Sequence, residues 1–125
     1  MTLAIHHFAV VVHDLERAER FYSGLLGLPV LKRWSDDHGQ PRSIWLELEN
    51  GTFLAVERAS THGARADGDP GWHCVALGIS RSDREMWRTK LEAAGHPVIR
   101  SSDFTLYVRD PEGQLVGLSH YPHSS

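Results

Sequence analysis

The chain has 125 residues, of which 41% are hydrophobic and 23% are charged, as is typical of one soluble domain with a modest core. A formal net charge of −3, with histidines neutral, excludes a strongly basic surface for nucleic acid. A single cysteine, Cys74, excludes an intrachain disulfide and indicates a reducing, cytoplasmic environment. Since no apolar run approaches the roughly 20 residues of a membrane span, the sequence predicts neither a membrane nor a nucleic-acid partner.

The first part of the chain predicts a strand followed by a helix. Residues 3–12 are rich in valine and favour an extended backbone. Asp14 is a suitable N-cap for a helix over residues 15–26, whose apolar side chains recur at helical spacing. Gly27 supplies the backbone conformation that commonly ends such a helix.

A hairpin is the clearest element of the middle of the chain, after a short strand over residues 30–35. The dipeptide Asn50-Gly51 stands between alternating apolar residues, which is the pattern of a two-residue hairpin turn. With such a turn, residues opposite each other across the two strands share one face of the sheet. The face so predicted carries Ile44, Leu46, Phe53 and Glu57.

The order of elements repeats after a small, polar, glycine-rich linker at residues 59–71. A strand, a helix and three strands are expected over residues 72–79, 83–94, 97–102, 104–109 and 114–121. The tetrapeptide Gly27-Leu28-Pro29-Val30 recurs as Gly95-His96-Pro97-Val98. The sequence therefore predicts a single α+β domain of two βαβββ modules, residues 1–58 and 72–121. These modules are expected to pair into a curved mixed sheet around a central cleft that takes a small ligand.

Four stretches carry a resemblance to a known family, and together they span nearly the whole chain. They are "HHFAVVVHDLERAERFYSGLLGL", "LENGTFLAVE", "GWHCVALGI" and "YVRDPEGQLVGL". In them the chain resembles the vicinal-oxygen-chelate superfamily, which includes glyoxalase I, extradiol dioxygenases, fosfomycin-resistance enzymes and bleomycin-binding proteins. The resemblance implies a small-molecule ligand or substrate and a homodimer.

The resemblance also implies where a divalent metal ion would bind. Metal-dependent members take their ligands, usually His and Glu, from the first and last strands of each module, and the metal acts as a Lewis acid. Those four places fall on His7, Ala55, Cys74 and Gly117. Alanine and glycine offer no side-chain ligand, whereas a stable site normally needs three or four. The expected cofactor is therefore none, or a divalent metal ion at a shifted site of His7 and Glu57 with Cys74.

Strand alternation places His7 in the cleft and Phe8 on the helix side. An imidazole titrates near neutrality, so His7 is a candidate acid/base group, and Glu57 beside an apolar patch is the second. The other candidate ligand contacts are Ile44, Leu46, Phe53, Cys74 and Ser119, with Trp34, Trp45 and Trp72 as further lining residues. Whether Tyr107 and Arg109 face the cleft depends on the residue count of their hairpin turn, which stays open.

Two classes of function fit these residues, and the sequence does not decide between enzyme and binding protein. The first is a glyoxalase-like lyase or isomerase in which His7 and Glu57 transfer protons, with or without a metal ion. The alternative is a metal-free, ligand-sequestering protein of the bleomycin-resistance type, which the depleted ligand set favours. A fold used only for dimerisation or regulation ranks below both.

Overall fold

The structure is a computed structural model that describes residues 2–61, 63, 66 and 68–123. Residues 62, 64–65 and 67 of the predicted linker lie outside the described residues. The chain divides into two compact units, Met1–Gly63 and Ala64–Ser125. In the described part of the chain, no helix is both long enough and apolar enough to cross a membrane.

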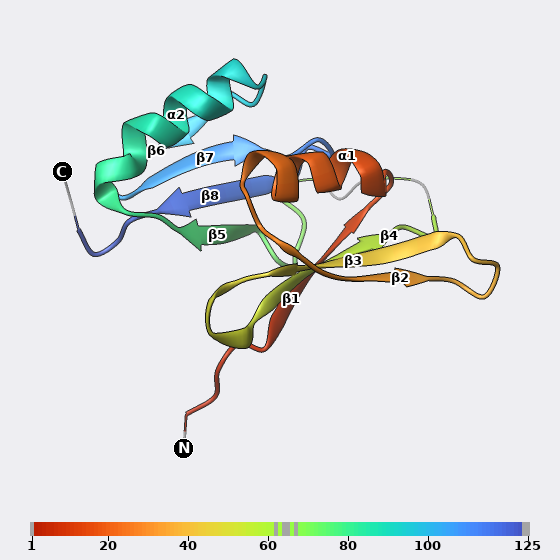
Figure 1. Cartoon of the computed structure of the whole chain (residues 1–125). Coiled ribbons are helices and arrows are strands. Elements are labelled where there is room, and N and C mark those ends of the chain that lie inside the picture. The colour runs from red at the N-terminus through yellow and green to blue at the C-terminus, as the bar shows by residue number, and fades with distance from the viewer. Residues whose placement is uncertain (1, 62, 64–65, 67, 124–125) are drawn as a thin grey trace. The chain divides into compact units, whose positions relative to one another are not determined.

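The first unit is a βαβββ module with a mixed four-stranded sheet (Figure 1). Its elements are β1 (His7–Val12), α1 (Leu15–Glu19), β2 (Val30–Ser35), β3 (Pro41–Glu47) and β4 (Phe53–Arg58). The strand order is β1-β4-β3-β2, with β1 parallel to β4 and the other neighbours antiparallel. β1 is shorter than predicted because its partner β4 begins at Phe53, which pairs with His7 and leaves residues 3–6 without a strand to pair with.

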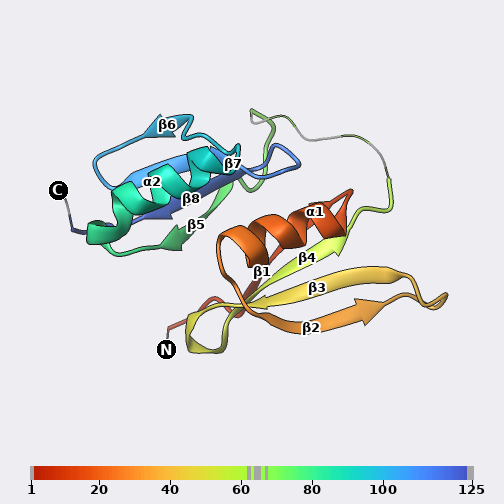
Figure 2. The same cartoon turned by 45° about the horizontal axis from the view of Figure 1, so that its top comes forward.

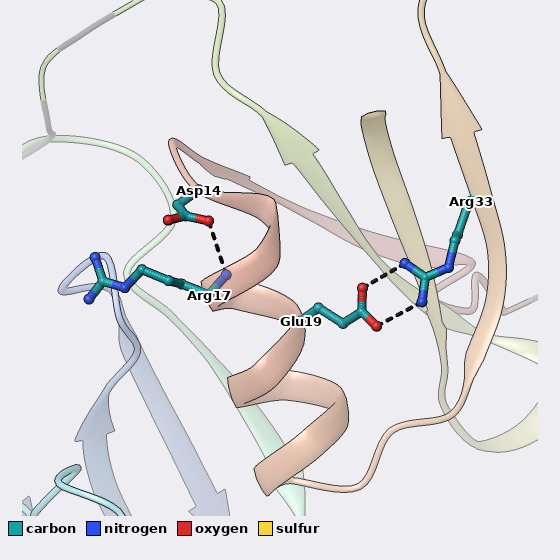
Figure 3. Close-up of polar contacts among 4 residues, drawn as sticks. All are labelled: Asp14, Arg17, Glu19 and Arg33. Atoms are coloured by element: carbon teal, nitrogen blue, oxygen red, sulfur yellow. Dashed lines mark hydrogen bonds and ion pairs between the residues drawn. The ribbon is translucent and has the colours of Figure 1, made fainter. Parts of the chain in front are cut away.

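Local sequence signals explain where α1 begins and ends. The Asp14 carboxylate accepts a hydrogen bond of 3.0 Å from the backbone N–H of Arg17, which is the N-cap predicted from the sequence (Figure 3). The helix continues through a wider, π-type stretch, Arg20–Leu25, so the predicted span is confirmed. Gly27 follows with a φ of 85°, a left-handed conformation that glycine adopts without strain.

An ion pair ties α1 to the edge strand β2. Arg33 donates two hydrogen bonds to the Glu19 carboxylate, at 2.6 and 2.7 Å (Figure 3). These hydrogen bonds, helped by the charge of Arg33 and opposed by partial burial, hold the pKa of Glu19 below its usual value. Arg33 therefore lies on the face of the sheet that α1 covers, and strand alternation sends its neighbours Lys32 and Trp34 to the other face.

The apolar core of the first unit lies between α1 and this helix-side face of the sheet. Its strands contribute side chains at most 4% exposed, namely Val12, Ile44, Leu46, Leu54 and Val56. The helical segment contributes Ala18, Phe21 and Tyr22, which are at most 2% exposed. Burial of such side chains supplies the main driving force for folding of the module.

The hairpin between β3 and β4 differs from the prediction by one residue. Its loop is Glu49–Gly51, three residues long, and the N–H of Leu48 closes it by donating to the Thr52 carbonyl at 2.9 Å. The observed pairs are Ser43 with Glu57, Trp45 with Ala55, and Glu47 with Phe53. Because side chains alternate between faces, this shift moves Ile44 and Leu46 to the helix side. The predicted two-residue turn was wrong, and so was the placement of these two residues beside Glu57.

The second unit repeats the module (Figure 2). Its elements are β5 (Cys74–Gly78), α2 (Arg84–Ala93), β6 (Arg100–Ser101), β7 (Thr105–Arg109) and β8 (Leu115–Ser119). The strand order β5-β8-β7-β6 is equivalent, strand for strand, to the order β1-β4-β3-β2 of the first sheet. The predicted α+β fold of two βαβββ modules is confirmed, and each of the two sheets is made of strands from its own module in the described part of the chain.

Three of the four hairpins close in the same way. In these three, a backbone N–H donates across the loop to the carbonyl four residues on, from Asp36 to Gln40, Leu48 to Thr52 and Asp110 to Gln114. The third loop residue is a glycine with a positive φ, at Gly39, Gly51 and Gly113. The fourth hairpin, between β6 and β7, has a shorter loop, across which the Ser102 N–H donates to the Thr105 carbonyl. The β3–β4 and β7–β8 loops are equal in length, so these strands place equivalent residues on equivalent faces in the two modules. This settles the open question for Tyr107 and Arg109, which share a face with Gly117 and Leu115.

Candidate functional site

The first sheet has one face that points away from α1, which we call the open face. It is made of His7, Ala9 and Val11 on β1, Phe53, Ala55 and Glu57 on β4, Ser43, Trp45 and Glu47 on β3, and Lys32 and Trp34 on β2. The alternation predicted for β1 is confirmed, since His7 is exposed on this face while Phe8 lies on the other side.

Aromatic rings from all four strands form a continuous row across the open face. The ring centroids of Trp34 and Trp45 are 5.1 Å apart, and those of Trp45 and Phe53 are 4.4 Å apart with 23° between the planes. His7 stacks on the other side of Phe53, at 4.7 Å and 5°. Such offset and stacked pairs add attraction beyond the burial of their surface. Because these rings stack face to face along the row, Phe53 is covered by Trp45 and His7, and the row presents mainly ring edges to a molecule laid on the sheet.

His6 joins this row although strand alternation predicts that it points away. It precedes the first residue of β1, so the pleat does not fix its direction. Its ring contacts Phe53 edge-on at 5.6 Å, and its Nδ1 lies 2.9 Å from Nδ1 of His7. One of these two nitrogens donates and the other accepts, so the two rings are coupled through a single hydrogen bond.

Small residues form the floor of the open face between its two predicted acid/base groups. Ala9 pairs directly with Ala55, in the row of residues between those of His7 and Glu57. His7 pairs with Phe53, so about 13 Å of strand separates it from Glu57 at ~3.3 Å per residue. The structure therefore brings the two predicted catalytic residues onto one face, at opposite ends of it.

Hydrogen-bonding atoms without partners lie at the β2 end of the same face. Trp34 and Ser43 are opposite each other across β2 and β3. The Trp34 Nε1 and the Ser43 Oγ are both buried and have no hydrogen-bond partner among the described residues, and Ser43 is only 2% exposed. Lys32 places its ammonium 3.9 Å from the Trp34 ring centroid. Sequence reasoning missed Lys32 and Ser43, because their face depended on the length of the hairpin loop.

The equivalent face of the second unit is packed by its own side chains. Cys74, which is half-buried, pairs with Leu115 at one end of this face. Ser119 does face the same side, and its Oγ accepts a hydrogen bond of 2.9 Å from the Thr105 hydroxyl. The Arg100 guanidinium lies 4.5 Å from the centre of the Tyr107 ring, which crosses the strand beside Gly117.

The residues at the family's four metal positions do not fit a divalent metal ion. Ala55 and Gly117 offer no donor, and in the described part of the chain no three His, Cys, Asp or Glu side chains gather in one place. A Cβ at Gly117 would lie 3.2 Å from the Thr105 methyl and 3.4 Å from the Tyr107 ring, so neighbours occupy the space that a ligating side chain would use. His7 is the one residue of the four that keeps a usual ligand type.

Comparison with known proteins agrees with this architecture. The sequence profile of the Glyoxalase/Bleomycin resistance protein/Dioxygenase superfamily matches residues 4–118. No curated protein sequence matches the chain at a significant level. Two solved structures with a similar fold are a lactoylglutathione lyase from Agrobacterium tumefaciens and a glyoxalase/dioxygenase from Nostoc punctiforme. The first is 21% identical, with a TM-score of 0.72 over 94% of this chain and 93% of that one. The second is 17% identical, with a TM-score of 0.79 over 96% and 92%.

A third similar structure contains a metal ion. It is a fosfomycin resistance protein, FosX, from Listeria monocytogenes in complex with Mn(II) and dihydroxypropylphosphonic acid. That chain is 15% identical, with a TM-score of 0.74 over 95% of this chain and 93% of that one. At this identity the likeness concerns the fold alone.

Proposed function

Because the chain belongs to the Glyoxalase/Bleomycin resistance protein/Dioxygenase superfamily, we propose that it binds a small organic molecule on its open face without the family's metal ion. The observation that carries this proposal is the row of rings from Trp34 to His7, which runs over four strands. Beside the row, the short side chains of Ala9 and Ala55 leave the surface of the sheet free of bulky groups. An aromatic molecule laid there gains apolar burial and edge-to-face contacts with rings whose faces are stacked on one another.

We further propose that binding is not followed by conversion, so that the protein sequesters its ligand. His7 and Glu57 lie at opposite ends of the open face, and two of the four family metal positions carry no donor. A sequestering protein needs only a complementary surface, whereas proton transfer needs its acid and base within hydrogen-bond reach of one substrate. A homodimer and a cytoplasmic location stay predictions.

Binding can be tested with naphthamide, a neutral planar aromatic probe, by intrinsic fluorescence and by heteronuclear NMR. The Trp45→Ala variant removes the centre of the row, and Trp87→Ala is the matched control, because Trp87 lies on α2 of the second unit. We expect saturable binding by the unaltered protein and by Trp87→Ala, and at least tenfold weaker binding by Trp45→Ala. Equal binding by all three proteins, or no saturable binding, would refute the proposal.

A second candidate, an acid/base enzyme centred on His7, is favoured by the hydrogen bond between His6 and His7. In that contact one Nδ1 carries the proton and the other accepts the hydrogen bond, so the pair holds one imidazole ready to give a proton to, or take one from, a bound substrate. Mass spectrometry of incubated ligand distinguishes the two functions. A product that His7→Gln fails to form would establish the enzyme and exclude simple sequestration.

A further inference from the structure

The β2 end of the open face gathers three side chains that donate hydrogen bonds. We name Lys32, Trp34 and Ser43 together the donor corner. Lys32 and Trp34 are two residues apart on the same face of β2, and Ser43 lies opposite Trp34 on β3. From these positions we infer that the ligand of the proposed function is an aromatic carboxylate. Its ring lies on the aromatic row, and its carboxylate binds at the donor corner.

The two neutral donors lack any other role in the described part of the chain. Buried polar groups in proteins nearly always have a partner, and exceptions need a specific explanation. Here the Trp34 Nε1 and the Ser43 Oγ have no hydrogen-bond partner, and their residues are opposite each other across β2 and β3. Both side chains belong to the open face rather than to the core under α1. An indole N–H can only donate, so the missing partner of Trp34 must be an acceptor.

Charge selects a carboxylate among the possible acceptors. Lys32 is the only lysine or arginine of the open face, since the neighbouring Arg33 turns to the helix side and pairs with Glu19. A carboxylate can accept from the Trp34 N–H and the Ser43 hydroxyl while pairing with the Lys32 ammonium. The Lys32 side chain, which lies across the Trp34 ring, is expected to move as the carboxylate enters.

The acidic residues of the face limit where the carboxylate can bind. Glu57 is directly opposite Ser43 on β4, on the other side of Ser43 from Trp34, and Glu47 pairs with Phe53 at the other end of the face. Repulsion by Glu57 disfavours a carboxylate on the β4 side of Ser43, and repulsion by Glu47 disfavours one near Phe53, which leaves the side of Ser43 next to Lys32 and Trp34. The anionic end therefore points to β2, and the ring lies towards Trp45 and Phe53.

The test compares naphthoate with its neutral isostere naphthamide, on the full chain, by calorimetry. We expect naphthoate to bind about tenfold more tightly, which is typical of one charge-assisted contact. Lys32→Gln should abolish this preference. Lys90→Gln is the matched control, because Lys90 also lies over a tryptophan ring, that of Trp87 at 5.0 Å, but on α2. It should keep the full preference.

Two further variants separate binding from folding. Trp34→Phe keeps a ring but removes the N–H, so naphthoate affinity should fall several-fold while naphthamide affinity changes little. Ser43→Ala should weaken naphthoate binding without lowering the melting temperature, because its hydroxyl has no partner to lose. A loss of melting temperature in Ser43→Ala, with naphthoate affinity unchanged, would refute the role of Ser43.

The outcomes also distinguish this inference from the proposed function on which it rests. If naphthoate and naphthamide bind the open face equally well, or if Lys32→Gln keeps the preference, the carboxylate inference is wrong and ligand binding on the face stands. If neither probe perturbs the resonances of Trp45 and Phe53, both proposals are wrong.

Discussion

Gly117 lies where a side chain would crowd its neighbours, and its replacement by alanine tests the packing of the second unit. An added Cβ would lie 3.2 Å from Thr105 Cγ2, 3.4 Å from Ala76 Cβ and 3.4 Å from Tyr107 Cε1. The first of these distances is too short for the methyl groups to stay in place. Thr105 cannot simply rotate away, because its hydroxyl is held by the hydrogen bond to Ser119. Its methyl group is thus held against position 117.

Two opposing effects set the size of the change. Replacing a glycine whose φ is not positive stabilises a protein by about 0.4–1 kcal/mol, because the unfolded chain loses freedom. Overpacking of a tight site costs about 1–3 kcal/mol. With one tight contact among three, we expect Gly117→Ala to lower the free energy of unfolding by about 0.5–1 kcal/mol. Thr105→Ser removes the methyl and keeps the hydroxyl, so in that background Gly117→Ala should stabilise by roughly 0.5 kcal/mol.

A double-mutant cycle measured by urea unfolding checks this reasoning. The coupling between positions 105 and 117 should be about 1 kcal/mol, well above the few tenths expected for independent sites. The m-value should stay constant, which shows that the surface exposed on unfolding is unchanged. A Gly117→Ala variant more stable than the unaltered protein, or effects of the two substitutions that add within ~0.3 kcal/mol, would contradict this reasoning. Either result would show that Thr105 or its strand moves aside without a cost in free energy.

Three more predictions test other parts of the fold. The pKa of Glu19 is lowered in the folded state by Arg33, so the ion pair stabilises the protein above the unfolded pKa of about 4.3 and is lost as pH falls through the folded value. Arg33→Gln should therefore cost about 0.5 kcal/mol at pH 7 and nothing at roughly pH 2–3, by urea unfolding, since Arg33 is largely solvent-exposed; a pH-independent cost would contradict this. Leu46→Ala should cost about 2–5 kcal/mol because the side chain is fully buried under α1, and a cost below ~1 kcal/mol would mean that it lies on the open face instead. Gly113→Ala should cost about 1–2 kcal/mol at its φ of 85°, with the melting temperature as readout and an unchanged value as the contrary result.

The order and type of the elements could be predicted because each has a local signal. Asp14 caps the first helix with its side chain, and Gly27 ends it in a left-handed conformation. The second helix ends in the same way at Gly95, with a φ of 86°, but begins without a side-chain cap. Strand ends were less accurate, because a strand ends where its partner ends. β6 is the example: residues 97–102 were predicted extended, but only Arg100–Ser101 pair with β7.

Only part of the candidate site could be predicted, because the face of a strand after or before a hairpin depends on the number of residues in the loop. His7, Phe53 and Glu57 were placed on one face correctly, because alternation along a single strand needs no partner. Ile44 and Leu46 were exchanged for Ser43 and Trp45, because the face of β3 depends on whether the loop after it has an even or odd number of residues. Asn50-Gly51 indicates a turn but does not count the residues in it, since Asn50 tolerates the left-handed backbone of either loop.

The loop closure that three of the four hairpins share constrains how this sequence can diverge. If one residue were inserted in the Glu49–Gly51 loop and the register of β3 shifted to accommodate it, Leu46 would turn to the open face and Trp45 would turn under α1. We therefore expect these loops to change by substitution and not in length. The loops Asp36-Asp37-His38-Gly39 and Asp110-Pro111-Glu112-Gly113, which differ in sequence but not in length, are an example within this chain. Length variation among relatives should concentrate in the segment that joins the modules. An alignment that opens a gap within one of these loops will assign the wrong side chains to the open face.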